Sequence, residues 1–428
     1  MRRSMTGVLL AVLLVAVPTV ALAQKPVEVT IAHFADLTGP IASAAVPLDQ
    51  GLRDYLRWAQ EEGHDPIPGL KVNLVWEDTA YSADRYVPTY KKFKDAGAVL
   101  LINESSTANS VLGELVRADR IPMISPGTGY MPGFFPRDIS RKGSSYIFFD
   151  RPPYPDFFAA IATHFLGQWK AGGSPGKPKA MFITWDTPYG RGPVELGTVW
   201  AESVGFEMLP PQLFPSGTTD LTQQLLKAQE LGANFIYMNS LEGHFSMLLK
   251  GARRLGMPFG VGSGKVMFGG GSECHNDDLL RLAGEAAEGV WAVSSYPNWD
   301  EDVKAVKWAK EVQTRNRGKV DPRGNYFMGF SFSRLAWETL KQTAKKYGPD
   351  KVNRENITRT LTEIRGLDMW GAAPAFTYGP NERRPFRVMN VHAVKGGKWV
   401  RLATVETPWI TPPAEEAALP GWRPPGPK

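Results

Sequence analysis

Short apolar runs alternate with longer segments of helical periodicity along most of this chain, beginning at Val27. Strands that are separated by helices of roughly 10–15 residues indicate parallel sheets covered on both faces. The first half predicts strands at 27–34, 70–76, 98–102 and 121–124, and helices at 47–62, 85–96 and 110–118. The alternation therefore predicts an α/β fold.

The pattern restarts after a stretch rich in proline, glycine and aromatic residues (129–136) and a short strand at 146–149. Further strands are predicted at 180–185, 235–238 and 289–294, and helices at 156–169, 192–204, 219–231 and 242–255. The last section predicts helices at 300–314, 326–346 and 354–364, and extended segments at 388–394 and 399–405. With 428 residues, the chain is long enough for two lobes that each bury a core.

The composition excludes several classes of protein. It is 43% hydrophobic and 21% charged, as in ordinary globular proteins. The net charge of +6 is small and scattered, so we expect no nucleic-acid partner. A single cysteine rules out an internal disulfide and any cysteine-rich metal site.

The first 23 residues have the layout of a secretory signal peptide. Arg2 and Arg3 precede an apolar run from Gly7 to Val17, and Ala21-Leu22-Ala23 predicts cleavage before Gln24. The alternative is an uncleaved anchor, but the run is shorter than the roughly 20 residues that span a bilayer. We therefore expect an exported, soluble protein. At the other end, six of residues 411–428 are proline, which predicts a disordered or surface-draped tail.

Known catalytic motifs are missing from the sequence. The six histidines are scattered without a zinc-binding pair, and no Gly-x-Ser-x-Gly sequence occurs. The glycine-rich run 260–271 matches neither the phosphate loop nor the dinucleotide fingerprint. Cys274 lies beside His275, but adjacent side chains normally diverge. We predict no catalytic residues, no metal and no cofactor.

Seven short strings occur in a fixed order across the mature chain. They are Leu37-Thr38-Gly39-Pro40, Glu77-Asp78, Ser105-Ser106-Thr107, Ile121-Pro122-Met123-Ile124-Ser125-Pro126, Tyr189-Gly190-Arg191-Gly192, the run from Phe214 to Thr219-Asp220, and Ala286-Ala287-Glu288-Gly289-Val290. In this order, behind a signal peptide, residues 27–405 resemble the periplasmic branched-chain amino acid-binding proteins of ABC importers.

The resemblance implies a type I periplasmic-binding fold, in which two Rossmann-like lobes with parallel sheets are joined by three crossover strands. Crossings are then expected near 148–151, 289–293 and 376–380. The implied division is a signal peptide at 1–23, lobe 1 at 24–148 plus 292–376, lobe 2 at 149–291 plus 377–410, and the tail at 411–428.

The implied function is capture of a small molecule between the lobes, at the carboxyl ends of the strands, by hinge closure. The implied partner is an ABC permease in the inner membrane, the location is the periplasm, and the protein is expected to be a cofactor-free monomer. A sensor that feeds a membrane receptor would use the same fold, and an exported α/β hydrolase is a third alternative.

The ligand is expected to meet polar residues that follow the strands. Hydroxyl groups and free helix N–H groups after two strands suit an anion, although Ser and Thr at these places also cap helices. Tyr189 either reaches across the cleft as a lid or packs locally. The candidate ligand-binding residues are Glu104, Ser105, Ser106, Thr107, Ser125, Gly127, Thr128, Tyr189, Ser240, Glu242 and Ser263.

Three positions depart from the family pattern for amino acids. Family members have Ser where this chain has Glu104, Thr where it has Gly129, and an acidic residue where it has Ser263. An ionised glutamate would repel a buried carboxylate. An alignment shifted by one residue would instead give these roles to Ser105 and Thr128.

With the first alignment, we predict a ligand other than a simple branched-chain amino acid. Glu104 would accept from an amide, amine or hydroxyl, and Glu242 is a second acceptor. Aromatic residues near the cleft suit a flat or aromatic ligand, unless they belong to the lobe cores. They are Tyr130, Phe148, Phe149, Tyr154 and Trp185.

Overall fold

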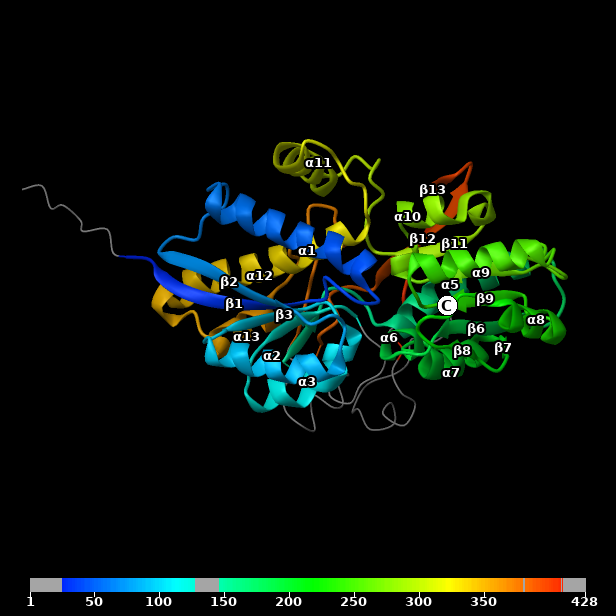
Figure 1. Cartoon of the computed structure of the whole chain (residues 1–428), viewed down its shortest axis with the longest axis horizontal. Helices are drawn as coiled ribbons and strands as arrows, with labels where there is room; N and C mark the ends of the chain where they lie inside the picture. Colours follow the sequence, from blue (N-terminus) through cyan, green and yellow to red (C-terminus); the bar gives the residue numbers. More distant parts are fainter. Residues whose placement is uncertain (1–24, 128–145, 380–381, 409, 411–428) are drawn as a thin grey trace, which may run out of the picture.

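Two α/β bodies lie side by side in the computed structural model, which describes residues 25–127, 146–379, 382–408 and 410 (Figure 1). We call the body that contains the N-terminal strand the first lobe and the other the second lobe. The predicted signal peptide and the predicted tail lie outside the described residues.

The first lobe is built on a parallel sheet. Its strands, in order across the sheet, are β2 (Leu70–Asp78), β1 (Val27–Ala35), β3 (Leu100–Asn103), β4 (Met123–Ser125) and β5 (Ile147–Phe149). Val29 and Ile31 of β1 pack into one apolar cluster, whereas Ala32 and Phe34 pack into another. Both faces of the sheet are therefore covered, as the continuous apolar runs predict.

The second lobe is built on a larger, mixed sheet. Its strands, in order, are β13 (Lys398–Glu406), β12 (Val388–Lys395), β11 (Trp291–Ser294), β10 (Met267–Gly270), β9 (Phe235–Met238), β6 (Lys179–Trp185) and β7 (Glu207–Met208), and β8 (Gln212–Phe214) also pairs with β6. The pairings are parallel from β7 to β11, and the last two strands form an antiparallel hairpin on β11.

Helices follow the strands in both lobes. Those of the N-terminal part are α1 (Ala42–Leu56), which continues as the π-helix η1 (Arg57–Glu61), α2 (Ala83–Asp95) and α3 (Ser106–Ala118). Those of the second lobe are α5 (Tyr154–Ala171), α6 (Pro188–Arg191), α7 (Val194–Val204), α8 (Thr222–Leu231), α9 (Glu242–Arg254), α10 (Asp277–Ala283), and the 3-10 turns η2 (Ser272–Cys274) and η3 (Gly284–Ala287).

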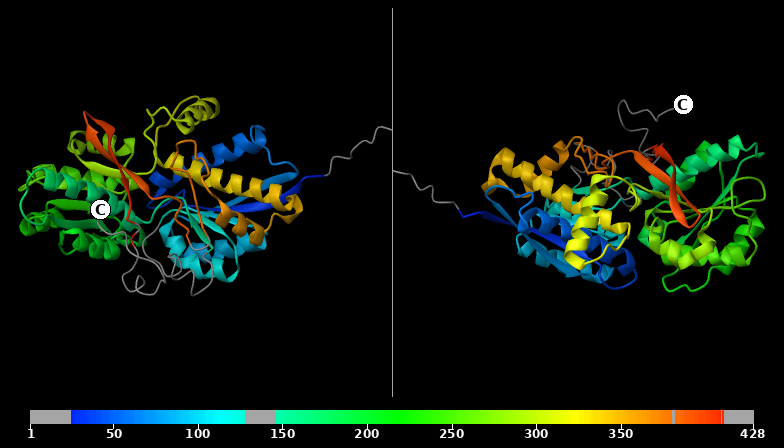
Figure 2. Two further views of the ribbon diagram at one scale, coloured as in Figure 1. Left: turned by 180° about the vertical axis from the view of Figure 1, so that it is seen from behind. Right: turned by 90° about the horizontal axis from the view of Figure 1, so that it is seen from above.

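The chain returns to the first lobe for its last helices, which are α11 (Lys304–Arg317), α12 (Asn325–Tyr347) and α13 (Arg354–Glu363), with the 3-10 turn η4 (Pro349–Lys351) before α13. Figure 2 shows these yellow and orange helices beside the blue strands, with the red hairpin on the other lobe. Helices α1 and α12 meet through Gly51 and Gly329, where a Cβ would collide with the backbone of the opposite helix. Small residues are required there because the two backbones touch.

The chain passes between the lobes after β5, after β11 and before β12. The two lobes, with a parallel sheet in the first and a mostly parallel sheet in the second, agree with the type I periplasmic-binding fold that the sequence predicts. The exact residue boundaries of the lobes stay a prediction. Within the described residues, no helix has the length and apolar character to cross a bilayer.

Candidate functional site

A small, partly open cavity with a volume of about 40 Å³ lies between the two lobes, at the carboxyl ends of their strands. The first lobe contributes residues from α1, α12 and the ends of β2, β3 and β4, and the second contributes residues that follow β6, β9 and β10. The lining comprises Ile41, Ala44, Ala45, Leu48, Tyr81, Glu104, Ser106, Pro126, Arg151, Tyr154, Tyr189, Leu241, Glu273, Asn325 and Met328.

Arg151 supplies the guanidinium group of this cavity. It follows β5, where the chain first leaves the first lobe, and its side chain is only 1% exposed. Its Nη1 donates to Ser272 Oγ at 2.9 Å and to Glu273 Oε1 at 3.1 Å, while its Nη2 contacts the sulfur of Met328. Its Nε lies 3.2 Å from Asp150 Oδ1. Arg151 therefore links the crossing segment to both lobes.

Glu273 lies opposite, in η2, directly after β10. Besides Arg151, its carboxylate faces two hydroxyl donors, because Tyr189 Oη lies 2.6 Å and Ser272 Oγ lies 2.7 Å from its Oε2. The ring of Tyr189 packs edge-on against Tyr154, whose hydroxyl lies 2.8 Å from Ser106 Oγ. A polar network thus crosses from the second lobe to the first.

Glu104 brings a second carboxylate to the cavity, at the end of β3. Its Oε1 accepts from the backbone N–H of Asp36, and its Oε2 lies 3.5 Å from Nε2 of the fully buried His33. His33 Nδ1 lies 3.4 Å from Asp49, which is paired with Arg53. These four charged side chains form a line from the cavity to the outer side of α1.

Burial and charge act on this line in opposite directions. Burial raises the pKa of Glu104 to about 7, against the opposing effect of His33. Burial alone would lower the pKa of His33, but the flanking carboxylates of Asp49 and Glu104 raise it to about 9. His33 therefore carries a positive charge at neutral pH, and Glu104 lies close to its protonation midpoint.

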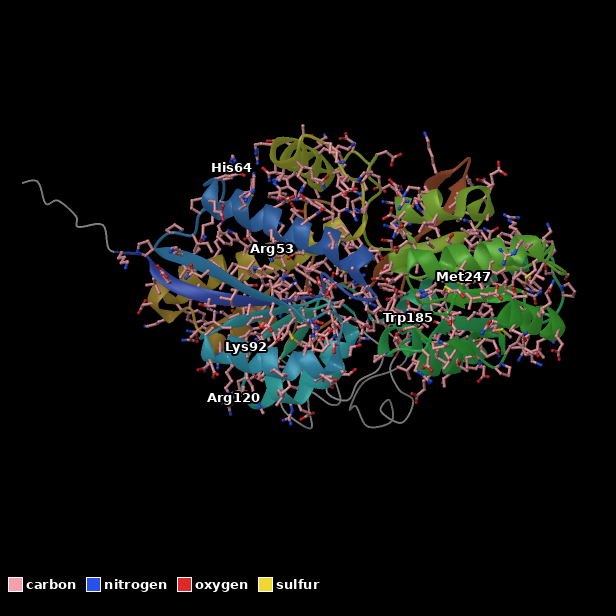
Figure 3. The ribbon with its side chains drawn as sticks, in the orientation of Figure 1. Arg53, His64, Lys92, Arg120, Trp185 and Met247 are labelled. Carbon is pink, nitrogen blue, oxygen red and sulfur yellow. The ribbon has the colours of Figure 1, made fainter. Side chains whose placement is uncertain are left out.

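Side chains on the two lobes also meet beside the cavity. The ring of Tyr81, which follows β2, stacks on Trp185 at the end of β6 with centroids 6.2 Å apart and planes 12° apart. Figure 3 labels Trp185 at the side of the second lobe that faces the first. Burial raises the pKa of Tyr81 to about 12, opposed by the hydroxyls of Thr107 and Thr187, one from each lobe. These contacts join the two lobes in the arrangement that the structure shows.

We expect Tyr81→Leu to shift the lobes toward an open state by about two- to tenfold, because an aromatic pair contributes about 0.5–1.5 kcal/mol beyond its buried area. The only cysteine, Cys274, is buried, so fluorophores attached to Asp95→Cys and Glu202→Cys would report the distance between lobes. Tyr347→Leu, at the end of α12, is the matched control. Equal energy transfer in both variants would contradict a role of the stack in closure.

Three of the predicted binding residues line the cavity: Glu104, Ser106 and Tyr189. Thr107 lies near Tyr81 but does not line the cavity. Gly127 packs so closely against the carbonyl of Pro152 that any side chain would collide with it. Thr128, like Gly129 and Tyr130, lies outside the described residues.

Ser105 and Ser125 hold the first lobe together instead. Ser105 Oγ accepts from the N–H of Ala108 and from the hydroxyl of Tyr86, so the cap alternative applies to this residue. Ser125 Oγ donates to Asn109 Oδ1 at 2.7 Å. Neither side chain lines the cavity.

Two further candidates in the second lobe, Ser240 and Glu242, do not line the cavity. Ser240 Oγ lies 2.8 Å from the ring of His244, and only its backbone carbonyl approaches Tyr189. Glu242 is the first residue of α9. Burial raises the pKa of its carboxyl group, whereas its own backbone N–H and Ser43 on α1 lower it. Glu242 thus contacts the first lobe without lining the cavity.

The expectation that Ser263 lies in the cleft is wrong. Ser263 is exposed in a turn before β10, at the amino end of that strand. Because the strands around β10 are parallel, their carboxyl ends share the other edge of the sheet, where Glu273 lies. The acidic side chain that this lobe contributes to the cavity is therefore Glu273.

Arg151, Glu273, Tyr81, Asn325 and Met328 are cavity residues that the sequence analysis missed. Arg151 had a signal, since it follows the predicted strand at 146–149, whereas Glu273 had none, because β10 was not predicted. Of the aromatic candidates, Tyr154 lines the cavity, whereas Phe148, Phe149 and Trp185 belong to the buried cores. No group of metal-ligating side chains occurs in the described part of the chain.

Two α/β lobes with a polar cavity between them are the architecture of a two-lobed ligand-binding protein. The periplasmic binding protein family model matches residues 28–398, and the chain belongs to this family. None of the curated proteins compared with this chain matches it.

Several solved structures share the fold. A branched-chain amino acid ABC transporter protein from Thermus thermophilus with bound valine has a TM-score of 0.78 and 22% identity, covering 90% of this chain and 97% of its own. A fatty acid ABC transporter substrate-binding protein from Thermomonospora curvata has a TM-score of 0.72 and 18% identity, and the match covers 90% of this chain and 93% of that protein. A solute-binding protein from Rhodopseudomonas palustris in complex with 3,4-dihydroxybenzoic acid has a TM-score of 0.70 and 17% identity, and the match covers 91% of this chain and 99% of that protein.

Proposed function

We propose that this chain is the exported solute-binding protein of an ABC importer. It captures a small polar or aromatic metabolite, of the amino acid, amide or aromatic acid type, in the cavity between its lobes. It works in the periplasm as a monomer without a cofactor, and it delivers its ligand to a permease in the inner membrane. The observation that carries the proposal is the cavity itself, since both lobes and the crossing segment contribute polar side chains to it.

The chemistry of the cavity supports binding rather than catalysis. In the described part of the chain, Ser240 Oγ lies 2.8 Å from His244 Nδ1, as in an activated nucleophile, but neither residue lines the cavity. Burial raises the pKa of Cys274 well above its usual range, so its thiol stays protonated. The polar side chains that line the cavity, among them Arg151, Glu273 and Tyr189, make hydrogen bonds within the protein, which suits recognition of a ligand.

Thermal denaturation with a panel of amino acids, amides, amines and aromatic acids tests the proposal. A ligand that binds only the closed lobes stabilises the protein by RT ln(1 + [L]/Kd), or about 2.7 kcal/mol at a hundredfold excess over Kd. The ligand that raises the melting temperature is then added to the protein with its reconstituted transporter, and we expect stimulated ATP hydrolysis. A melting curve that no small metabolite moves would contradict capture, and a transporter indifferent to the loaded protein would contradict delivery.

A further inference from the structure

Carboxylates outnumber cationic side chains around the cavity. Glu104 and Glu273 both line it, and Asp150 contacts the single lining arginine among the described residues. Behind Glu104, the charges of His33 and Asp49 offset one another. The immediate surroundings are therefore net negative once Glu104 is ionised, which disfavours a ligand that brings a further anion.

The guanidinium of Arg151 already forms ion pairs within the protein. Its Nη1 donates to Ser272 and Glu273, and its Nη2 contacts the sulfur of Met328. Its Nε lies 3.2 Å from Asp150 and makes no hydrogen bond within the described residues, so the guanidinium is already flanked by two carboxylates of the protein. A ligand carboxylate would have to displace Glu273 and leave that group buried without its cation. Removing one partner from a buried ion pair is costly.

Glu104 has an acceptor to spare. Among the described residues, none makes a hydrogen bond to its Oε2, although this atom is buried. The His33 ring at 3.5 Å supplies charge at a distance longer than a good hydrogen bond. Across the cavity, Glu273 Oε1 accepts from Arg151 and keeps a second lone pair. Each lobe thus brings to the cavity a carboxylate with unused acceptor capacity.

We propose that the cavity selects a small organic cation bearing N–H donors, of the alkylammonium or amidinium type, which Glu104 and Glu273 hold from opposite lobes. This inference rests on the proposed function, because it names the ligand class of the same cavity. A cation between the two carboxylates favours closure, since each lobe supplies one of them. The cavity volume of about 40 Å³ in this structure suits a small ligand.

Calorimetry on the full mature chain tests the ligand class with methylammonium, ethylammonium and acetamidinium against acetate, benzoate and leucine. We expect the cations to bind and Glu104→Gln to weaken them about 10- to 100-fold, the range for a charge-assisted hydrogen bond. Asp54→Asn is the matched control, because Asp54 is an equally buried acid of α1 outside the cavity lining, and it should leave the affinity unchanged.

The pH profile adds an independent readout. Glu104 faces His33 and Asp36 from the first lobe, Asp49 lies behind His33, and Arg151 and Glu273 line the cavity opposite. Burial brings the pKa of Glu104 to about 7, and only the ionised carboxylate holds a cation. As the pH increases toward 7, the affinity for the cation should therefore increase about tenfold per pH unit, and above pH 7 it should become constant. Glu104→Gln should flatten this profile.

The outcomes separate this inference from the proposed function. If benzoate or leucine binds more tightly than every cation, or if Glu104→Gln binds cations as well as the unmodified protein does, the cation proposal is wrong while capture of a small molecule stands. If no member of any class binds, both proposals fail together.

Discussion

Replacing Arg151 with methionine should lower the free energy of unfolding by about 3–5 kcal/mol, the range for removing one partner of a buried ion pair. The side chain is 1% exposed and faces Asp150 and Glu273, which would remain buried without a cation. Burial already raises the pKa of Asp150 to about 6, even with Arg151 present. Methionine keeps much of the apolar volume of the side chain, so the decrease in the free energy of unfolding reflects mainly the loss of the positive charge. Urea denaturation at pH 7 measures it.

Arg359→Met is the matched control for this substitution. Arg359 pairs with Glu355 on the exposed side of α13, and removing such a pair should cost less than about 1 kcal/mol. The penalty of Arg151→Met should also shrink as the pH falls from 7 to 5, because the orphaned carboxylates then take up protons. Equal stabilities of the two variants would contradict the central place of Arg151 in the fold.

A second large effect should appear in acid, from a pair of stacked histidines in the second lobe. The rings of His275 and His392 lie 4.0 Å apart with planes at 19°. Burial lowers the pKa of both, and that of His275 falls to about 4 in spite of the opposing Asn298. The unfolded chain takes up protons from about pH 6.5 downward while the folded chain does not. Stability from His275 is therefore complete above pH 6.5, and roughly 3 kcal/mol is lost as the pH falls to 4.

The comparison that isolates this effect is between the unmodified protein and His275→Phe, measured by urea denaturation from pH 7.5 to 4. Carboxylates with raised pKa values, such as Asp156 at about 6, act in the opposite direction but are common to both proteins and cancel in the difference. We expect the unmodified protein to lose stability relative to the variant as the pH falls. His64→Gln on the exposed surface is the control, and a difference that stays constant with pH would refute the assignment.

Strands with continuous apolar runs were the part of the fold that sequence could predict. Residues 235–238 form β9 as predicted, because its four apolar or aromatic residues are all buried. Strand β1 covers 27–35 where 27–34 was predicted, since its apolar residues prevail although Glu28, Thr30 and His33 interrupt them. The prediction failed at β10, whose residues Met267–Gly270 end in two glycines and have little strand propensity. The error at Ser263 follows from it, since the missing strand moved the expected strand end to the wrong side.

The sequence allowed the location of the cavity at the strand ends to be predicted, but not which side chains point into it. Glu104, Ser105 and Ser106 follow β3 consecutively, yet the first and third line the cavity while the middle one caps α3. Successive residues entering a helix point about 100° apart, so a string of hydroxyl groups does not say which of them faces a ligand. Arg151 was harder still, because the group that marks it as a buried cation, Glu273, lies 122 residues further along the chain.

Neither lobe is continuous in sequence, and this sets an order on how the protein can assemble as its chain emerges from a ribosome or a translocation channel. The sheet of the first lobe is complete at Phe149, but α12, which packs on α1, ends only at Tyr347. In the second lobe, β11 is an open edge until Val388 and the strand that follows it arrive. An open edge next to apolar surface promotes association between chains. A chain that ends before residue 388 therefore leaves the strand edge of β11 unpaired, and we expect such a truncated chain to associate with other chains more readily than the full chain does.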